Sequence, residues 1–292
     1  MRKNFVVSVI VGLLCLFTSG ISADVGPQVG KEYRPPGTHG GPMMYVPEGN
    51  FWMGCNEAVD KLCKENEKPY HQVYLDAFYM DKYEVTLDDY MECVKAGGCK
   101  PPEVRESQGH ILSANMKYCN WKHPGRGKHP INCVEWFKAK AYCEYAGKRL
   151  PTEAEWEKAA RGTDGRIYPW GNQPPDCNLA IVVRRGKDGC GKDSTWPVGS
   201  KPKGASPYGI MDMAGNVAEM AADWKDTNYY KHSPRRNPKG PDAATDKWQK
   251  RIIRGGNFND DTGWFERTSF RAGRPQWDIY HLDGFRCAKD VE

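Results

Sequence analysis

Arginine and aromatic side chains occur together near the end of the chain, where they could bind a ligand. The stretch 254–287 contains several aromatic rings and the arginines Arg254, Arg267, Arg271, Arg274 and Arg286. Planar guanidinium groups can stack on such rings and bind carboxylates at the same time. The Gly255-Gly256 pair lets two backbone segments approach where a side chain would block them. We therefore expect this stretch to form one wall of a binding cleft.

The stretch 212–219, with the sequence DMAGNVAE, has the composition of a calcium-binding loop. Calcium takes roughly six to eight oxygen ligands, and many of them are backbone carbonyls of a loop that can curl. A plainer alternative is that Asp212 and Glu219 accept hydrogen bonds from backbone N–H groups in a turn. The composition alone leaves both possibilities open.

Three segments carry helix signals. The first begins at Thr86, which can cap the backbone N–H of Asp89, and it ends at Gly97-Gly98. The second covers about 134–146 and ends at Gly147. Its apolar stripe at helical spacing consists of Val134, Phe137, Ala141 and Tyr145.

The third helix follows Pro151. Thr152 and Glu155 form a capping box at its start, and Gly162 ends it. We expect its buried face to be formed by Trp156, Ala159 and Ala160.

Strand signals lie mainly before the first helix. Residues 44–54 alternate apolar positions around a turn and predict a hairpin, and residues 71–80 predict a further strand. Residues 100–132 predict a long loop. After residue 162 the pattern indicates only short strands and loops.

Composition indicates a loop-rich fold that packs on aromatic rings. The 292 residues include 31 Gly, 21 Pro, 10 Trp, 15 Tyr and 9 Phe. Acidic and basic residues are interspersed, and the formal net charge is only +5, so nothing indicates nucleic-acid binding.

The first residues have the pattern of an export signal. A basic start and an apolar run up to Thr18 predict a signal peptide at 1–23, with cleavage before Asp24. Cys15 follows Leu14 and not a small residue, which argues against a lipoprotein. No later stretch is apolar enough to span a membrane. We expect a secreted or periplasmic protein whose residues 24–43 form a Pro/Gly-rich, poorly ordered linker.

Of the 11 cysteines, Cys15 lies in the expected signal peptide, and the rest are even in number. Cysteines of an exported chain form disulfides; the competing reading is metal binding, but no pair has CxxC spacing. Short separations suggest four pairs and leave Cys143 for Cys287, although sequence alone does not fix connectivity. The four are Cys55 with Cys63, Cys93 with Cys99, Cys119 with Cys133, and Cys177 with Cys190.

A series of motifs gives the chain a resemblance to the sulfatase-modifying factor (formylglycine-generating enzyme) family. In order, they are 49–54 (GNFWMG), 84–86 (EVT), 147–157 (GKRLPTEAEWE), 169–172 (PWGN), 215–219 (GNVAE), 254–256 (RGG) and 284–287 (GFRC). The resemblance implies a single compact α+β domain over 44–292, with a C-type-lectin-like core and little regular secondary structure. It also supports the pairing of Cys143 with Cys287.

The resemblance also implies two structural calcium sites. The first would use the carbonyls of Asp212, Gly215 and Val217 with the carboxylate of Glu219. The second would lie in the loop 178–190 and use Asn178, Leu179, Asp188 and Cys190.

One departure from the family pattern bears on activity. The family enzyme holds copper(I) with two cysteines five residues apart, and thiolate is the suitable soft ligand. Here the matching positions are Asp260 and Phe265, a hard ligand and a non-ligand. We therefore expect no copper and no formylglycine-generating chemistry.

These observations favour a binding module for an extended peptide, a protein or a glycan. The expected ligand contacts are Trp170, Asn257, Phe258, Asp260, Asp261, Trp264, Arg267, Arg271 and Trp277. For any single ring, plain core packing is the alternative. Two other functions remain open: an oxidoreductase that acts on an extracytoplasmic peptide or small molecule by non-thiol chemistry, and a structural part of an envelope assembly.

Overall fold

The structure is a computed structural model that describes Met1 and residues 27–103, 116–260 and 263–292. The expected signal peptide, with Cys15, and the candidate contact Asp261 therefore lie outside the described residues. Over the described ranges, no helix is long and apolar enough to cross a membrane.

The first half of the fold is built on one interrupted antiparallel ribbon. β2 (Met43–Val46) pairs with β5 (Phe78–Asp81), and β3 (Gly49–Met53) pairs with β4 (His71–Leu75). Val46 pairs with Phe78 and Gly49 with Leu75, so both ladders share one register. Pro47, which has no backbone N–H to donate, lies in the break between them.

This pairing corrects two predictions. Residues 44–54 are not a hairpin, because β2 and β3 each pair with the 71–81 segment and not with each other. The strand predicted at 71–80 is two strands that belong to different sheets. The alternation of apolar residues indicated strands correctly, but it carries no information about the partner of each strand.

Two short strands complete the first sheet. β1 (Glu32–Tyr33) pairs with β2, and β10 (Ala288–Asp290) pairs with β5, which gives the order β1-β2-β5-β10. β1 lies within the stretch 24–43 that we predicted to be a poorly ordered linker. The ordered fold therefore begins before residue 44, and the chain end returns to the sheet in which it starts.

The described part of the chain contains the helices α1 (Leu87–Lys95), α2 (Trp136–Tyr145) and α3 (Glu153–Arg161). Capping boxes begin α1 at Thr86 and α3 at Thr152, which confirms both predicted starts. Gly162 has a φ of 72°, as a helix-ending glycine requires. The remaining helical turns are 3-10 segments: η1 (Glu65–Glu67), η2 (Met116–Tyr118), η3 (Asp188–Gly191), η4 (Pro202–Gly204) and η5 (Tyr229–Lys231).

The apolar stripe predicted for α2 is wrong at Phe137, whereas Val134 is buried just before the helix and Ala141 and Tyr145 are partly buried. Phe137 is 50% exposed, whereas the buried residues are Trp136, Ala139, Tyr142 and Cys143. Two contacts fix the rotation of the helix: the indole N–H of Trp136 donates to the carbonyl of Ala221, and Cys143 is tied to Cys287.

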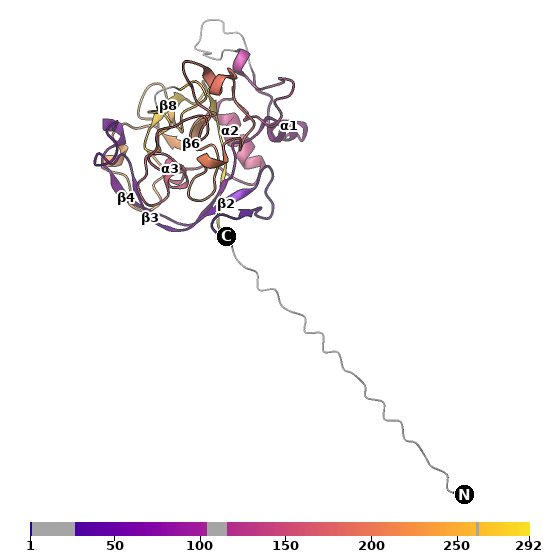
Figure 1. Cartoon of the computed structure of the whole chain (residues 1–292), viewed down its shortest axis with the longest axis horizontal. Coiled ribbons are helices and arrows are strands. Elements are labelled where there is room, and N and C mark those ends of the chain that lie inside the picture. Colours follow the sequence, from indigo (N-terminus) through magenta and orange to yellow (C-terminus); the bar gives the residue numbers. More distant parts are fainter. Residues whose placement is uncertain (2–26, 104–115, 261–262) are drawn as a thin grey trace.

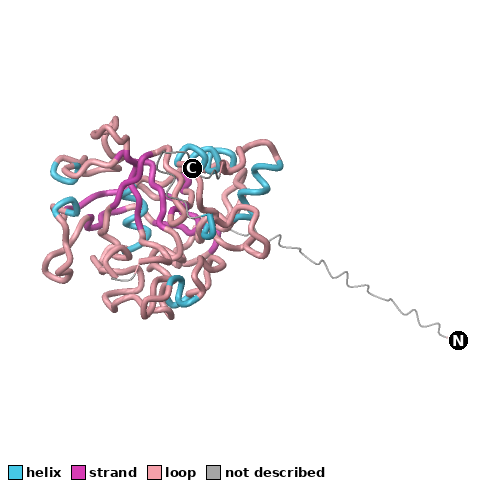
Figure 2. The backbone as a smooth tube through the Cα atoms, turned by 90° about the horizontal axis from the view of Figure 1, so that it is seen from above, coloured by secondary structure: helices cyan, strands magenta, loops and turns pink. Residues whose placement is uncertain are grey.

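The second half of the chain forms another sheet. Its strands are β6 (Ala218–Trp224), β7 (Lys250–Arg254), β8 (Ala272–Pro275) and β9 (Asp283–Gly284), in the order β8-β7-β6-β9. Figure 1 shows α3 and β6 near the middle of the fold, with α1 and α2 to one side and β3 and β4 to the other. Loops dominate the tube in Figure 2, which agrees with the composition of the chain.

Five disulfides cross-link these loops, and all of them join the pairs expected from the sequence. They are Cys55–Cys63, Cys93–Cys99, Cys119–Cys133, Cys143–Cys287 and Cys177–Cys190. A disulfide-rich α+β domain is thus confirmed, and its C-type-lectin-like core stays a prediction. The bridge from Cys143 spans 144 positions and fastens α2 to the residue before β10.

Candidate functional site

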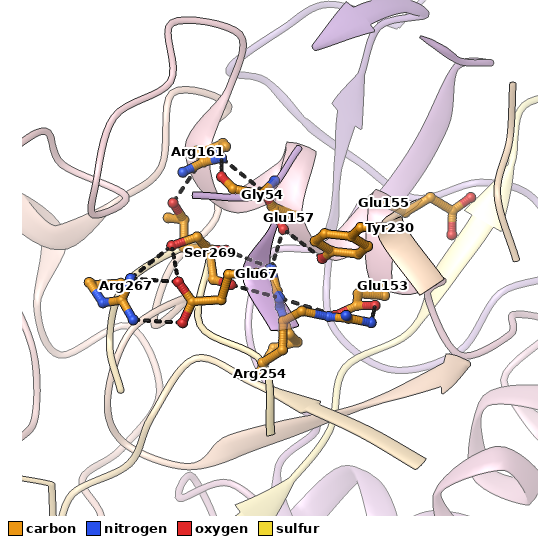
Figure 3. A network of polar contacts seen from close by, with 12 residues as sticks. Gly54, Glu67, Glu153, Glu155, Glu157, Arg161, Tyr230, Arg254, Arg267 and Ser269 are labelled. Carbon is orange, nitrogen blue, oxygen red and sulfur yellow. Dashed lines mark hydrogen bonds and ion pairs between the residues drawn. The ribbon is translucent and has the colours of Figure 1, made fainter. Parts of the chain in front are cut away.

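The centre of the molecule is a set of buried ion pairs between α3 and the C-terminal stretch. Arg254 at the end of β7 is 1% exposed and contacts the carboxylates of Glu153 and Glu157. Glu157 also accepts from Arg161 at 2.9 Å and from the amide of Gly54 at 2.7 Å. Figure 3 shows Arg161 and Arg254 reaching Glu157 from opposite sides. One carboxylate on α3 therefore joins β3, α3 and β7.

Two further arginines that we expected in a cleft belong to this buried system. Arg267 is 0% exposed, and its guanidinium contacts Glu67 at 2.7 Å and Asp60 at 2.8 Å. Arg271 is 2% exposed and contacts both oxygens of Glu153, at 2.6 and 2.7 Å. Both arginines are structural ion-pair partners, and the prediction that they contact a ligand is wrong as the structure stands.

Charge complementarity sets the protonation states in this system. Burial alone would raise the pKa of Glu153, but the charges of Arg271 and Arg254 outweigh it and hold the pKa below its ordinary value. Asp223 accepts from the amide of Glu153 at 2.8 Å, and it forms no ion pair with any described residue. Burial, helped by the charge of Glu153, raises the pKa of Asp223 to about 8.

The predicted first calcium loop is fully buried. Asp212 and Asn216 have φ of 57° and 61°, and Gly215 has a φ of 80°, so the loop does curl as a calcium loop must. In the described chain, no hydrogen bond to the carbonyls of Asp212, Gly215 or Val217 is present among those outside regular strands. These three carbonyls therefore keep lone pairs that a cation near the loop could use.

Glu219 fits a cation less well than we expected. Its two oxygens accept from Arg286 at 2.6 and 2.7 Å, and the indole N–H of Trp156 donates to it at 2.8 Å. The carboxylate is therefore used in an ion pair on β6.

Two other buried carboxylates lie close to this pair. Burial raises the pKa of Asp212 to about 6, against the stabilising amide of Gly199. Burial and the charges of Asp212 and Glu219 raise the pKa of Glu84 well above its ordinary value. Three carboxylates thus share the field of one arginine, Arg286, and a cation near the loop would relieve the excess negative charge. Sequence reasoning missed Glu84, although it lies in one of the family motifs.

The second predicted calcium loop is closed by a disulfide. Cys177 and Cys190 are bridged, with their Cα atoms 5.7 Å apart, so Asn178 and Leu179 are held close to Asp188. The carboxylate of Asp188 accepts from Asn259 at 2.6 Å. The four predicted residues are therefore brought to one place, beside the turn that carries Asp260.

That turn has no thiol at the two positions singled out from the sequence. Asp260 braces the turn by accepting from the backbone and side-chain N–H groups of Asn257, at 2.9 and 2.7 Å. Phe265 lies in a cluster with Trp264 and Phe270, whose centroids are 5.9 and 5.0 Å from its own. These three rings are all partly exposed.

The remaining predicted contacts divide into buried and accessible residues. Phe258 is 0% exposed, so it packs in the interior and the prediction that it contacts a ligand is wrong; Asn257 is 7% exposed. Trp170 is partly exposed and lines a cavity of about 250 Å³. Trp277 is 50% exposed but lies beside the start of α2, where the carbonyl of the preceding Gln276 accepts from the amide of Trp136.

Sequence reasoning missed the other walls of the Trp170 cavity. They include Asn56 and Val59 from the Cys55–Cys63 loop and Asp164 and Arg166 from the turn after α3. Trp264 is linked to this region, because Lys64, which follows Cys63 in the chain, places its Nζ 3.8 Å from the centroid of the Trp264 ring. The disulfide spacing was the available signal that these residues would form an ordered loop.

Comparisons with known proteins agree with the motifs. Residues 32–291 match the Sulfatase-modifying factor enzyme 1-like domain family. The formylglycine-generating enzyme of Mus musculus is 32% identical over 309 residues, which cover 89% of this chain and 80% of the mouse protein. The Streptomyces coelicolor formylglycine-generating enzyme is 33% identical over 305 residues, which cover 90% of this chain and 93% of that protein.

Solved structures show the same fold at lower identity. PvdO from Pseudomonas aeruginosa is similar with a TM-score of 0.71 and 24% identity, over 90% of this chain and 99% of that one. Treponema denticola variable protein 1 gives a TM-score of 0.65 and 21% identity, over 89% and 99%.

The buried ion pairs make a stability prediction. We expect Arg267→Ala to lower the free energy of unfolding by about 3–5 kcal/mol, because Glu67 and Asp60 would stay buried without their cation. The control is Arg236→Ala, which breaks an exposed pair with Asp76 and should cost at most about 1 kcal/mol. Urea denaturation of both variants measures this, and equal losses would contradict the structural role of Arg267.

Asp223 makes a prediction about pH. An unfolded aspartate has a pKa of about 4, and in the folded chain the value is about 8. Between pH 4 and pH 8, roughly, folding is therefore accompanied by uptake of a proton at Asp223. The contribution of Asp223 to the stability of the folded state falls as the pH rises through this range. We expect Asp223→Asn, which keeps an acceptor for the Glu153 amide, to differ least from the wild type at or below pH 4 and to become progressively more stable than the wild type up to pH 9. Thermal melts across this range test it, and a difference that does not vary with pH would disprove it.

Proposed function

This chain belongs to the Sulfatase-modifying factor enzyme 1-like family, and we propose that it is an exported, calcium-stabilised binding protein of that family. In this proposal the chain does not generate formylglycine with copper. The ligand is a peptide, a protein or a glycan that meets the partly exposed rings around Trp170 and Trp264. The family assignment rests on the matched domain, and the rest is argued from the residues of this chain.

The state of the cysteines carries the proposal. All ten cysteines in the described part of the chain are bonded in disulfides. Copper(I) needs soft ligands, and thiolates are the protein groups that supply them. At the two positions that the family resemblance assigns to thiols, Asp260 holds a turn and Phe265 packs between two rings. This arrangement supports binding over oxidation of a substrate thiol.

The same surface supports a binding role. Trp264, Phe265 and Phe270 form a partly exposed ring cluster, and Lys64 lies over Trp264. Rings that are both packed and partly exposed supply contact area at little entropic cost, because few rotatable bonds have to be fixed. The many disulfides agree with an exported protein, since such bonds persist in oxidising compartments.

Calcium would act here as a structural ion. The curled backbone of 212–217 and the disulfide-closed loop around Asp188 would supply oxygen ligands. A bound ion adds no step to a reaction in this proposal. It would order loops that have few regular hydrogen bonds of their own.

The absence of thiol oxidation can be measured directly. We expect the purified mature protein, given oxygen, copper(I) and a cysteine-containing peptide, to leave the peptide mass unchanged, because no described cysteine is free. The Streptomyces coelicolor formylglycine-generating enzyme serves as the positive control. Conversion of the peptide cysteine to an aldehyde by this chain would refute the proposal.

Calcium binding can be measured by its effect on unfolding. At a free calcium concentration of about 100 times the Kd, binding stabilises the folded state by roughly 2.7 kcal/mol, or on the order of 5–10 °C in Tm for a domain of this size. We expect chelation to remove this increase and Asp188→Ala to reduce it. Asp193→Ala, which breaks an exposed pair with Lys117 nearby, is the control. A Tm that does not respond to calcium would exclude the ion.

A further inference from the structure

Two cavities share Asn56 in their linings, and we call this neighbouring pair of cavities the Asn56 groove. The first, of about 250 Å³, lies between Asn56 and the turn that carries Trp170. The second, of about 700 Å³, lies between Asn56 and Tyr70. Because Asn56 lines both, the two cavities are neighbours.

Each cavity has an aromatic ring that is already held in place. Trp170 stacks on Tyr168, with centroids 5.4 Å apart and an interplanar angle of 5°, and its indole N–H donates to the carbonyl of Gln173 at 2.9 Å. Tyr70 stacks on Trp52, with centroids 5.0 Å apart and an angle of 21°. One face of each ring is covered by its neighbour, so the remaining face or the edge lines the groove. Neither ring has to be ordered when a ligand binds.

The polar groups beside Trp170 cancel in charge. Arg166 and Asp164 form a bidentate pair, with Nε–Oδ1 at 2.9 Å and Nη2–Oδ2 at 2.6 Å. The side-chain carbonyl of Asn172 accepts from the amide of Ile167 at 2.9 Å, which fixes the side chain and leaves its NH₂ group as a donor. The cavity therefore offers donors and acceptors without net charge, which suits hydroxyl groups and not a charged group.

The second cavity is nearly neutral as well. Glu57 and Lys68 pair at 2.7 Å. Lys231 is the remaining cation among the lining residues of this cavity, all of which are described, and it donates to the side chain of Asn228 at 3.0 Å. The cavity therefore offers an acidic polymer this one remaining cation and not a row of basic side chains.

The backbone of the groove does not suit an extended peptide. Within the described chain, none of the lining residues belongs to a β-strand; they lie in loops and in η5. Peptides that bind in extended form commonly add a strand to an exposed sheet edge, and main-chain hydrogen bonds supply the affinity. A saccharide needs no such edge, because ring faces and planar polar side chains recognise it.

We propose that the Asn56 groove binds a neutral oligosaccharide, with one sugar ring against Trp170 and a further unit near Tyr70. This inference rests on the proposed binding function and names its ligand class. Trp170 is the residue that we expect to select a neutral sugar over other ligands, because it combines a fixed ring with neutral hydrogen-bonding neighbours.

The test is a titration of the purified mature protein with neutral oligosaccharides. A neutral glycan array selects candidates, and cellohexaose, maltohexaose and chitohexaose are titrated by calorimetry and tryptophan fluorescence. We expect saturable binding of at least one glycan and a loss of affinity of about tenfold in Trp170→Ala, equivalent to about 1.4 kcal/mol. Trp170→Tyr, which keeps a ring, should retain most of the affinity.

The matched control is Trp248→Ala. Trp248 is 45% exposed and lines neither cavity of the groove, so its removal should leave affinity unchanged. Thermal melts show that each variant is folded. Equal losses in Trp170→Ala and Trp248→Ala, or no saturable binding of any array glycan or titrated sugar, would overturn the inference.

A second titration, with peptides as the ligands, distinguishes failure of the saccharide assignment from failure of the proposed binding function. Saturable binding of an extended peptide library that depends on Trp170 would overturn the saccharide assignment and leave the binding function standing. Conversion of a thiol peptide to its aldehyde would instead contradict the proposed function, regardless of the result of the sugar titrations.

Discussion

The fold depends on the buried pairing of α3 carboxylates with arginines that follow far along the chain. Glu153 and Glu157 are almost fully buried, and they would be costly there without Arg254, Arg271 and Arg161. A chain with so little regular structure has few sheet or helix contacts to hold its halves together. These ion pairs connect α3 to the 254–271 stretch, and the bridge from Cys143 to Cys287 fastens the chain end. The surface loops do not take part in these ion pairs, so they are available to bind a ligand.

This arrangement also explains why the arginine-rich stretch is a poor guide to the site. Guanidinium groups bind carboxylates equally well in a cleft or in the interior. Here the guanidinium groups of Arg267 and Arg271 are paired with the buried carboxylates of Glu67 and Glu153. The accessible face is instead built from rings that stack on other rings, such as Trp170 on Tyr168. Disulfides use every described cysteine, so none of them is a free thiol on that face.

Local signals in the sequence predicted local structure well. The capping boxes at Thr86 and Thr152 fixed two helix starts, because a cap depends only on residues three positions apart. Cysteine spacing suggested four of the bridges, and the fifth, Cys143–Cys287, was the pair that remained and that the family resemblance supported. Non-local facts were beyond these signals: the pairing of β2 with β5, the rotation of α2 that exposes Phe137, and the burial of Arg267 each depend on a distant partner. Asn56 escaped notice for the same reason, since only the fold brings it beside Trp170.

We conclude that this member of the family has kept its scaffold with every described cysteine used in a disulfide. Alkylation of the denatured, unreduced mature protein, followed by intact-mass measurement, tests it most directly. We expect no alkylated cysteine before reduction, and we expect alkylation after reduction at the ten positions that form the disulfides. Alkylation of a pair of cysteines before reduction would contradict it, because free thiols could then hold copper.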